Sequence, residues 1–238
     1  MQSAILALVD GEPQRMPIES QLTGDYPAIE ANATQYLDGK TIYHGNAADH
    51  IETPAQEVTV RESGISTSQT KHFETVACKW YADFEAGFIG VDTSDGDWLF
   101  QYLAAKHGVE VFETVVDLDA FAEQIAENVH ARAWEVSRKR SYDDDDEMEK
   151  VEINYHDSAN LAETARGGNI KLGFEYNWDG TIVRGTVSKS GYVAIYSSMT
   201  TATFGRWMHD ELVDHLTIPE SGSQAFLKEI QDREEADA

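Results

Sequence analysis

The chain has 238 residues, with 43 Asp and Glu against 18 Lys and Arg, so its formal net charge is −25. Hydrophobic residues make up 41% and aromatic residues 10%, which excludes a disordered acidic chain and suffices for a hydrophobic core. Such a surface repels itself at low ionic strength and is screened in molar salt, so the composition favours a halophilic protein of the cytoplasm. The rival interpretations are a mimic of nucleic acid and a protein that is acidic without such a role.

The cysteine content and the hydropathy of the chain exclude two further classes of protein, those held by disulfides and those that span a membrane. Cys78 is the only cysteine, so no intramolecular disulfide forms, and its place in an alternating run predicts a buried thiol. The apolar segment Ala4–Val9 is too short to cross a membrane and follows no positively charged segment. We therefore predict no membrane association.

Residues 1–65 predict an irregular, strand-poor N-terminal region. Short strands are expected at Ala4–Val9, Lys40–His44 and Glu57–Glu62, separated by turns and prolines.

Residues 66–142 predict an α/β unit. Val76 to Phe84 alternates like a half-buried strand, and a second strand is expected at Gly87–Val91. A helix capped by Ser94 or Asp95 follows and stops at Gly108. The remaining elements are a strand at Val109–Val116 and a long helix from Asp117 or Asp119 to about Arg140.

The aspartate run at 143–146 is the best candidate boundary, and residues 150–238 predict a hairpin-plus-helix unit. Asp179-Gly180 between Ile170–Trp178 and Thr181–Val187 is the strongest hairpin signal in the chain. The other expected elements are strands at Val151–Tyr155 and Gly191–Ser197, and helices at Ser158–Ala165, from Thr201 or Thr203 to about Leu216, and at Ser223–Arg233.

These elements predict an α+β fold, with a mixed or antiparallel sheet and helices packed on one face. Gly87–Val91 and Gly191–Ile195 each precede a helix that contains a tryptophan, Trp98 and Trp207. One interpretation is therefore a pair of similar ββα units; the other is the common ββα succession without duplication. The sequence predicts that the three regions form separate units or, alternatively, one compact domain.

Two acidic clusters are candidate metal sites. Asp92, Asp95 and Asp97 follow a predicted buried strand, where carboxylates can converge on a divalent cation such as Mg²⁺. The alternative is a helix cap, with Ser94 and Asp97 spaced as in a capping box. Glu211 and His215 are four residues apart on one helix face and suit a metal or an acid–base pair, or else a solvated polar face.

The rare cations gather around one tryptophan. The candidate partner-binding residues are Arg132, Trp134, Arg138, Lys139 and Arg140. We expect these residues near a helix C-terminus, where cations are stabilised by the helix dipole. The alternative is that they form a positive patch that binds phosphate or an acidic partner. Five strand aromatics predict a core face or, alternatively, a stacking platform for single-stranded nucleic acid: Phe174, Tyr176, Trp178, Tyr192 and Tyr196.

No nucleophile elbow, phosphate loop or dinucleotide fingerprint is present in the sequence, and no cofactor is indicated beyond a divalent cation at the acidic clusters. The sequence therefore favours a non-enzymatic binding or assembly protein that contacts a protein or nucleic acid and forms a homo-oligomer. The alternative is a metal-dependent hydrolase or nuclease that uses the acidic strand-end cluster.

Overall fold

The computed structural model describes residues 1–10, 20–22, 26–61, 64–128, 130–141, 148–161 and 169–219. The aspartate run at 143–146, residues 162–165 of the expected helix at Ser158–Ala165, and the expected helix at Ser223–Arg233 lie outside these residues. The first part of the helix expected at Ser158–Ala165 is wrong, because the strand Met148–Asn160 continues through these residues.

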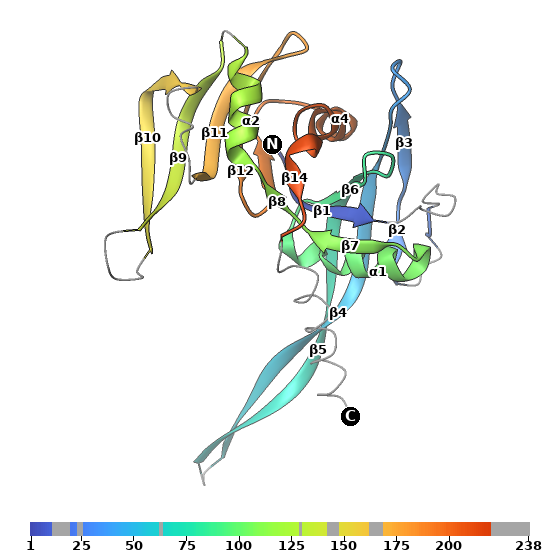
Figure 1. Cartoon of the computed structure of the whole chain (residues 1–238). Helices are drawn as coiled ribbons and strands as arrows, with labels where there is room; N and C mark the ends of the chain where they lie inside the picture. Colours follow the sequence, from blue (N-terminus) through green and yellow to red (C-terminus); the bar gives the residue numbers. More distant parts are fainter. Residues whose placement is uncertain are drawn as a thin grey trace.

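The described part of the chain is mostly β-structure (Figure 1). A 12-stranded antiparallel sheet has the order β10-β9-β11-β12-β13-β1-β6-β5-β4-β2, with β3 paired to β4 and β7 to β1. Its strands are β1 (Gln2–Asp10), β2 (Ala28–Ile29), β3 (Asn32–Gln35), β4 (Thr41–Arg61), β5 (Gly64–Asp83), β6 (Phe88–Val91), β7 (Glu110–Glu113), β9 (Arg132–Ser141), β10 (Met148–Asn160), β11 (Asn169–Trp178), β12 (Thr181–Ser188) and β13 (Tyr192–Ile195). A separate two-stranded sheet joins β8 (Val115–Val116) to β14 (Leu216–Thr217).

Helices are few. The described α-helices are α1 (Trp98–His107), α2 (Leu118–Ala126) and α4 (Thr201–Glu211), with short 3₁₀ turns at η1 (Ser94–Gly96) and η2 (Val213–His215). The predicted α+β fold with helices on one face is therefore wrong, because strands dominate and the helices lie on both faces.

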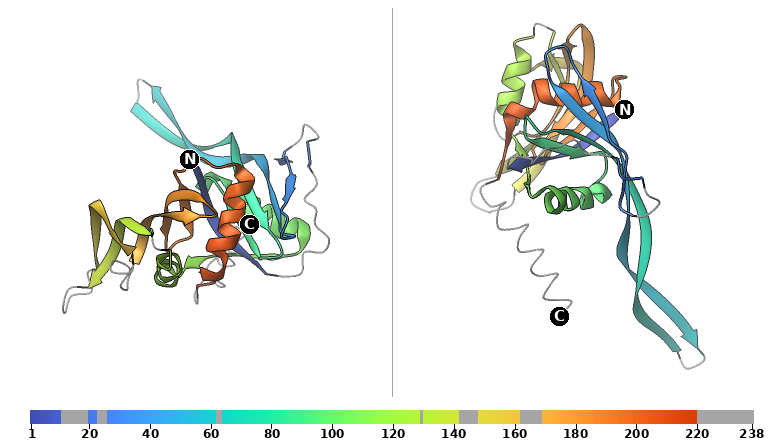
Figure 2. Two further views of the ribbon diagram at one scale, coloured as in Figure 1. Left: turned by 90° about the horizontal axis from the view of Figure 1, so that it is seen from above. Right: turned by 90° about the vertical axis from the view of Figure 1, so that its right-hand side faces the viewer.

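Strand β1 is the centre of the fold and divides the core in two. Leu6 faces the core that contains α2 and α4, whereas its neighbour Ala7 faces the core that contains α1. The same alternation separates Tyr81 from Trp80 on β5. Helices α1 and α4 thus cover opposite faces of the sheet (Figure 2). A hairpin followed by a helix occurs twice, at β5–β6–α1 and β12–β13–α4, but α1 and α4 pack into different cores.

The larger core is aromatic and centres on Trp207 of α4. This indole is fully buried and stacks on Phe174 of β11 at 5.9 Å and on Phe204 at 6.3 Å between ring centroids. Its Nε1 donates a 2.8 Å hydrogen bond to the hydroxyl of Tyr176. These contacts fix α4 against the sheet and position the polar side chains on its other side.

Two sequence-based predictions fail in the first 141 residues. The N-terminal region is not strand-poor, because β4 continues through Glu57 to Arg61 and pairs with β5 from Tyr43 to its end. The long helix predicted to reach Arg140 ends at Ala126, and residues 132–141 form strand β9. The β9–β11 register shifts between Gly173 and Phe174, and this bulge interrupts the two-residue alternation that marks a strand.

Other predictions are confirmed. Strand β1 and the β11–β12 hairpin form as expected, and Asp179 and Gly180 of its turn have φ values of 50° and 78°. Gly108 ends α1 in the left-handed conformation. The sheet contains strands from all three regions of the chain.

Candidate functional site

The long β4–β5 hairpin leaves the body of the molecule as a two-stranded arm (Figures 1 and 2). We define the arm as Glu52–Arg61 paired with Gly64–Phe73. No other strand of the described chain borders this part of the hairpin, so each of its two edges presents unpaired backbone groups. A two-stranded ribbon is only marginally stable in water by itself.

One face of the arm carries its large apolar side chains. Val60 pairs with Ile65 across the ribbon, and both are 73% exposed. Val58 is two residues from Val60 and lies on the same face, as does Phe73, which is eight residues from Ile65. We call Val58, Val60, Ile65 and Phe73 the apolar arm face. The opposite face carries Thr59, which pairs with Ser66.

The arm differs from the body in charge. Its paired strands contain two acids, Glu52 and Glu57, and two bases, Arg61 and Lys71, so their formal charge is zero in a chain of −25. Lys71 Nζ lies 2.7 Å from Glu52 Oε1, beside Phe73. The connecting turn adds one acid, Glu62. A neutral, partly apolar arm therefore projects from an acidic body.

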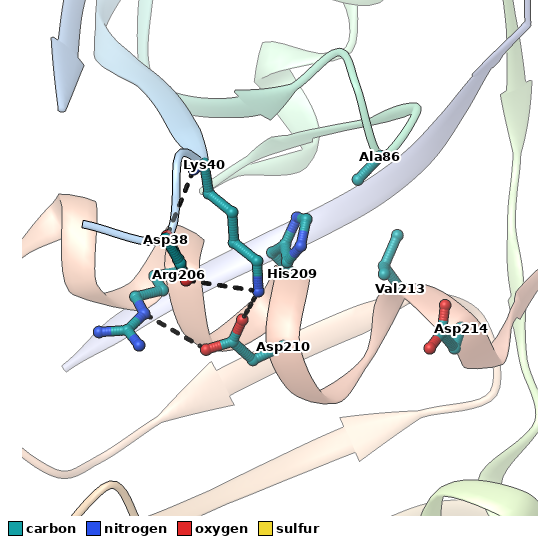
Figure 3. Close-up of a pocket in the computed structure, with 8 residues that line it drawn as sticks. All are labelled: Asp38, Lys40, Ala86, Arg206, His209, Asp210, Val213 and Asp214. Atoms are coloured by element: carbon teal, nitrogen blue, oxygen red, sulfur yellow. Dashed lines mark hydrogen bonds and ion pairs between the residues drawn. The ribbon is translucent and has the colours of Figure 1, made fainter. Parts of the chain in front are cut away.

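Helix α4 lines a cleft of about 660 Å³ on the body (Figure 3). The lining residues are Asp38, Lys40, Ala86, Arg206, His209, Asp210, Val213 and Asp214. Lys40 Nζ forms an ion pair with Asp210 Oδ1, and Arg206 Nε lies 3.3 Å from Asp210 Oδ2. The Arg206 guanidinium also lies over the rings of Tyr36 and Trp178, 5.0 and 5.7 Å from their centroids. Both cations of the cleft are thus already engaged by protein groups.

A histidine–aspartate pair forms one wall of this cleft. Asp83, at the end of β5, is 2% exposed, and its Oδ1 accepts hydrogen bonds from the backbone N–H groups of Glu85 and Ala86, each at 3.0 Å. Its Oδ2 lies 2.6 Å from Nδ1 of His209 on α4. This geometry orients the imidazole as in a general-base pair. None of the residues that line the cleft is Ser, Thr or Cys, however, so the pair has no side-chain nucleophile beside it.

Of the three aspartates proposed as a metal site, Asp92 has a local structural role, and Asp95 lies within the short turn η1. Asp92 Oδ1 accepts a 2.7 Å hydrogen bond from the backbone N–H of Lys79. Thr93, not Ser94, caps η1, and Asp97 precedes α1 as its N-cap without a side-chain capping bond. Within the described ranges, no three His, Cys, Asp or Glu side chains gather as metal ligands.

Glu211 and His215 both contact the side-chain amide of Gln124 on α2. The amide nitrogen of Gln124 donates to Glu211 at 3.4 Å, and its oxygen lies 2.6 Å from Nε2 of His215. Glu211 also accepts from the hydroxyl of Tyr176. Burial raises the pKa of Glu211 and lowers the pKa of His215. Because the amide of Gln124 lies between Glu211 and His215, these three side chains form a polar contact between α2 and the end of α4.

The lowered pKa of His215 predicts a pH-dependent stability. The folded state favours the neutral imidazole, so the free energy of unfolding falls as the pH drops through about 6.5, the ordinary histidine value. The raised pKa of Glu211 acts in the opposite sense, because protonation relieves its burial. His215→Gln should therefore reduce the loss of stability between pH 7.5 and 5.5, measured by urea unfolding. Replacing the exposed His130 by Gln is the control, and an equal loss in His215→Gln and the wild type would refute the assignment.

The predicted basic patch lies on a strand, not at a helix end. Arg132, Trp134 and Arg138 all belong to β9, whereas the side chains of Lys139 and Arg140 lie outside the described residues. Arg138 Nε donates to Asn169, which in turn donates to Asp119 of α2, so Arg138 lies on the α2 side of the sheet. The structure therefore does not gather the described members of the patch on one surface.

Trp134 belongs instead to an aromatic cluster on the sheet face opposite α2. It lies on Gly173, where an added Cβ would come within 2.8 Å of the indole. The guanidinium of Arg184 lies 5.2 Å from the indole centroid, and Tyr196 contacts its edge at 6.0 Å between centroids. Tyr192, Tyr196 and Arg184 are exposed. We call Trp134, Arg184, Tyr192 and Tyr196 the outer aromatic face. Of the five predicted strand aromatics, Phe174, Tyr176 and Trp178 lie in the core.

No family model matches the chain, and no curated protein matches its sequence. Among the described helices, none is long and apolar enough to cross a membrane.

The arm and the Asp83–His209 pair are features that sequence reasoning missed. The available signal for the arm was the low charge of residues 53–70 and the alternation of Val58 and Val60 with polar neighbours. Asp83 and His209 are 126 residues apart, and no local pattern connects them.

Proposed function

We propose that the chain is a non-enzymatic assembly protein of a halophilic cytoplasm, and that the arm joins two copies of it. The observation that carries this proposal is the apolar arm face, whose four large side chains are exposed on one side of an otherwise polar ribbon. Exposed apolar surface of this kind marks a site of association. Two copies related by a twofold axis present the same face to each other.

Charge favours a second copy as the partner. Two bodies of charge −25 repel each other, and the neutral arm keeps the contact away from both bodies. Concentrated salt screens the remaining repulsion and strengthens apolar contacts. Because the face is small by the standard of obligate interfaces, we expect a reversible dimer with a dissociation constant that is roughly micromolar.

Replacing Val60 and Ile65 by Thr should abolish the dimer. Threonine keeps the β-branched shape and strand preference, so the ribbon persists while the apolar contact is lost. Sedimentation equilibrium in about 2 M KCl, where the Debye length is a few ångströms at most, should show a dimer for the wild type and a monomer for Val60→Thr/Ile65→Thr.

The matched control exchanges the neighbouring pair on the opposite face, Thr59→Ser with Ser66→Thr. This control should dimerise like the wild type. A wild-type mass that stays monomeric up to high protein concentration, or equal dimerisation of both variants, would contradict the proposal.

A further inference from the structure

We infer that the outer aromatic face is a binding site for single-stranded nucleic acid, independent of the arm. In this half of the molecule the core face of the sheet is covered by α2 and α4, whereas α1 belongs to the other half. The outer side of β12 and β13 therefore presents Arg184, Tyr192 and Tyr196 to solvent. Ile182, on the same side of β12, is 62% exposed.

The chemistry of this face suits unpaired bases. Tyr192 and Tyr196 are 38% and 46% exposed, so each retains ring surface on which a base can stack. Arg184 and Trp134 already form a cation–ring pair at 5.2 Å, and Gly173 leaves room for the indole to lie flat on the sheet. Aromatic rings beside a guanidinium are the combination that binds bases without regard to their sequence.

Local charge supports the same ligand. Arg132, Lys171 and Arg184 face the outer side together with Glu135 and Glu175, and these five side chains sum to one excess positive charge in a chain of −25. Lys171 Nζ lies 2.7 Å from Glu135 Oε1. A phosphate backbone laid on these side chains therefore meets less repulsion than it would on an acidic part of the surface.

Salt distinguishes stacking from ion pairing. Affinity that rests on phosphate contacts falls steeply with salt concentration, whereas stacking of bases on aromatic rings is not an ionic interaction. A protein that works in concentrated salt, as proposed above, needs the second mode. The aromatic composition of this face, with few cations around it, fits that requirement.

The test is fluorescence anisotropy of a labelled oligothymidine of about 20 nucleotides, long enough for one site, titrated with the full chain in concentrated KCl. The wild type should bind, and the Tyr192→Ala/Tyr196→Ala variant should bind at least about tenfold more weakly. Arg184→Glu should weaken binding too, and a duplex of the same length should bind more weakly than the single strand.

Two controls separate this face from the rest of the molecule. Phe73→Ala removes an exposed aromatic ring from the arm and should leave the affinity unchanged, because that ring lies far from the outer aromatic face along the chain and on another hairpin. Val60→Thr/Ile65→Thr should still bind as a monomer, so that failure of the arm proposal would leave this one standing.

Three results would overturn the inference. The first is no binding by the wild type up to roughly 100 µM protein, the weak end of non-specific nucleic-acid binding. The second is equal affinity of the wild type and Tyr192→Ala/Tyr196→Ala. The third is a change of oligomeric mass in that variant without an effect on the oligonucleotide, which would identify the face as a contact between protein chains.

Discussion

Trp207→Ala should lower the free energy of unfolding by about 5 kcal/mol. Truncation of a buried tryptophan costs about 3–5 kcal/mol through lost burial and the cavity that remains. The change also leaves the Tyr176 hydroxyl, which accepts the indole N–H at 2.8 Å, without that donor in the core. Because domains are typically stable by about 5–15 kcal/mol, the variant should be close to unfolding.

Urea unfolding followed by circular dichroism in concentrated KCl measures this loss. Trp207→Phe keeps an aromatic ring against Phe174 and Phe204 and should lose less than half as much. Tyr192→Ala, on the exposed outer face, should stay within about 0.5 kcal/mol of the wild type. A loss below about 1 kcal/mol for Trp207→Ala would show that α4 is not held by this aromatic core.

Asp83→Ala should cost about 3 kcal/mol, because three hydrogen bonds meet at one buried carboxylate. Two of them hold the turn between β5 and β6, and the third ties this turn to His209 on α4. Asp83→Asn retains an oxygen that can accept from the turn but places an NH₂ donor opposite Nδ1 of His209, so the contact with His209 loses its charge and its acceptor and the cost should be intermediate.

A double-mutant cycle with His209→Ala measures the coupling directly. Because the two side chains share a buried hydrogen bond, the stability losses of the two single variants should differ from that of the double variant by at least about 1 kcal/mol after summation. Additivity within about 0.5 kcal/mol would mean that Asp83 acts on the turn alone and that the pair does not position α4.

Local chemistry decided which elements could be predicted. The β11–β12 hairpin follows from Asp179-Gly180, because both residues adopt the positive φ that such a turn requires. Strand β1 follows from its short apolar run, which is buried from both sides of the sheet. These signals act within a few residues and need no knowledge of the rest of the fold.

The errors came from long-range structure. Helical spacing is real up to Ile125, but Ala131 N–H then bonds back to Asn128, and the chain enters β9. In that strand the bulge beside Trp134 and Glu135 removed the alternation that would have identified it. Because these residues form a strand, the described cations expected at a helix C-terminus point to opposite faces of the sheet.

The arm could not be recognised for a different reason. Strand prediction relies on one buried face, and the arm has no core of its own to impose that pattern. Its strands are 21 and 20 residues long, far beyond the usual five or six, because they continue from the body into the two-stranded ribbon. Pairing along this length is visible only in three dimensions.

Cysteine cross-linking on the arm tests the proposed assembly most directly. The native thiol of Cys78 is buried, and burial raises its pKa to about 12, so it stays unreactive. Thr67 pairs with Val58 and lies on the apolar arm face, whereas the adjacent Ser68 points to the opposite face, and both are exposed. Each can be replaced by Cys without changing the core.

If the apolar arm faces of two copies pack together, Thr67→Cys should form covalent dimers with a short bismaleimide in concentrated KCl, and Ser68→Cys should not. Adding Val60→Thr and Ile65→Thr to Thr67→Cys should abolish the product. Equal cross-linking of Thr67→Cys and Ser68→Cys, or none by either, would contradict the account.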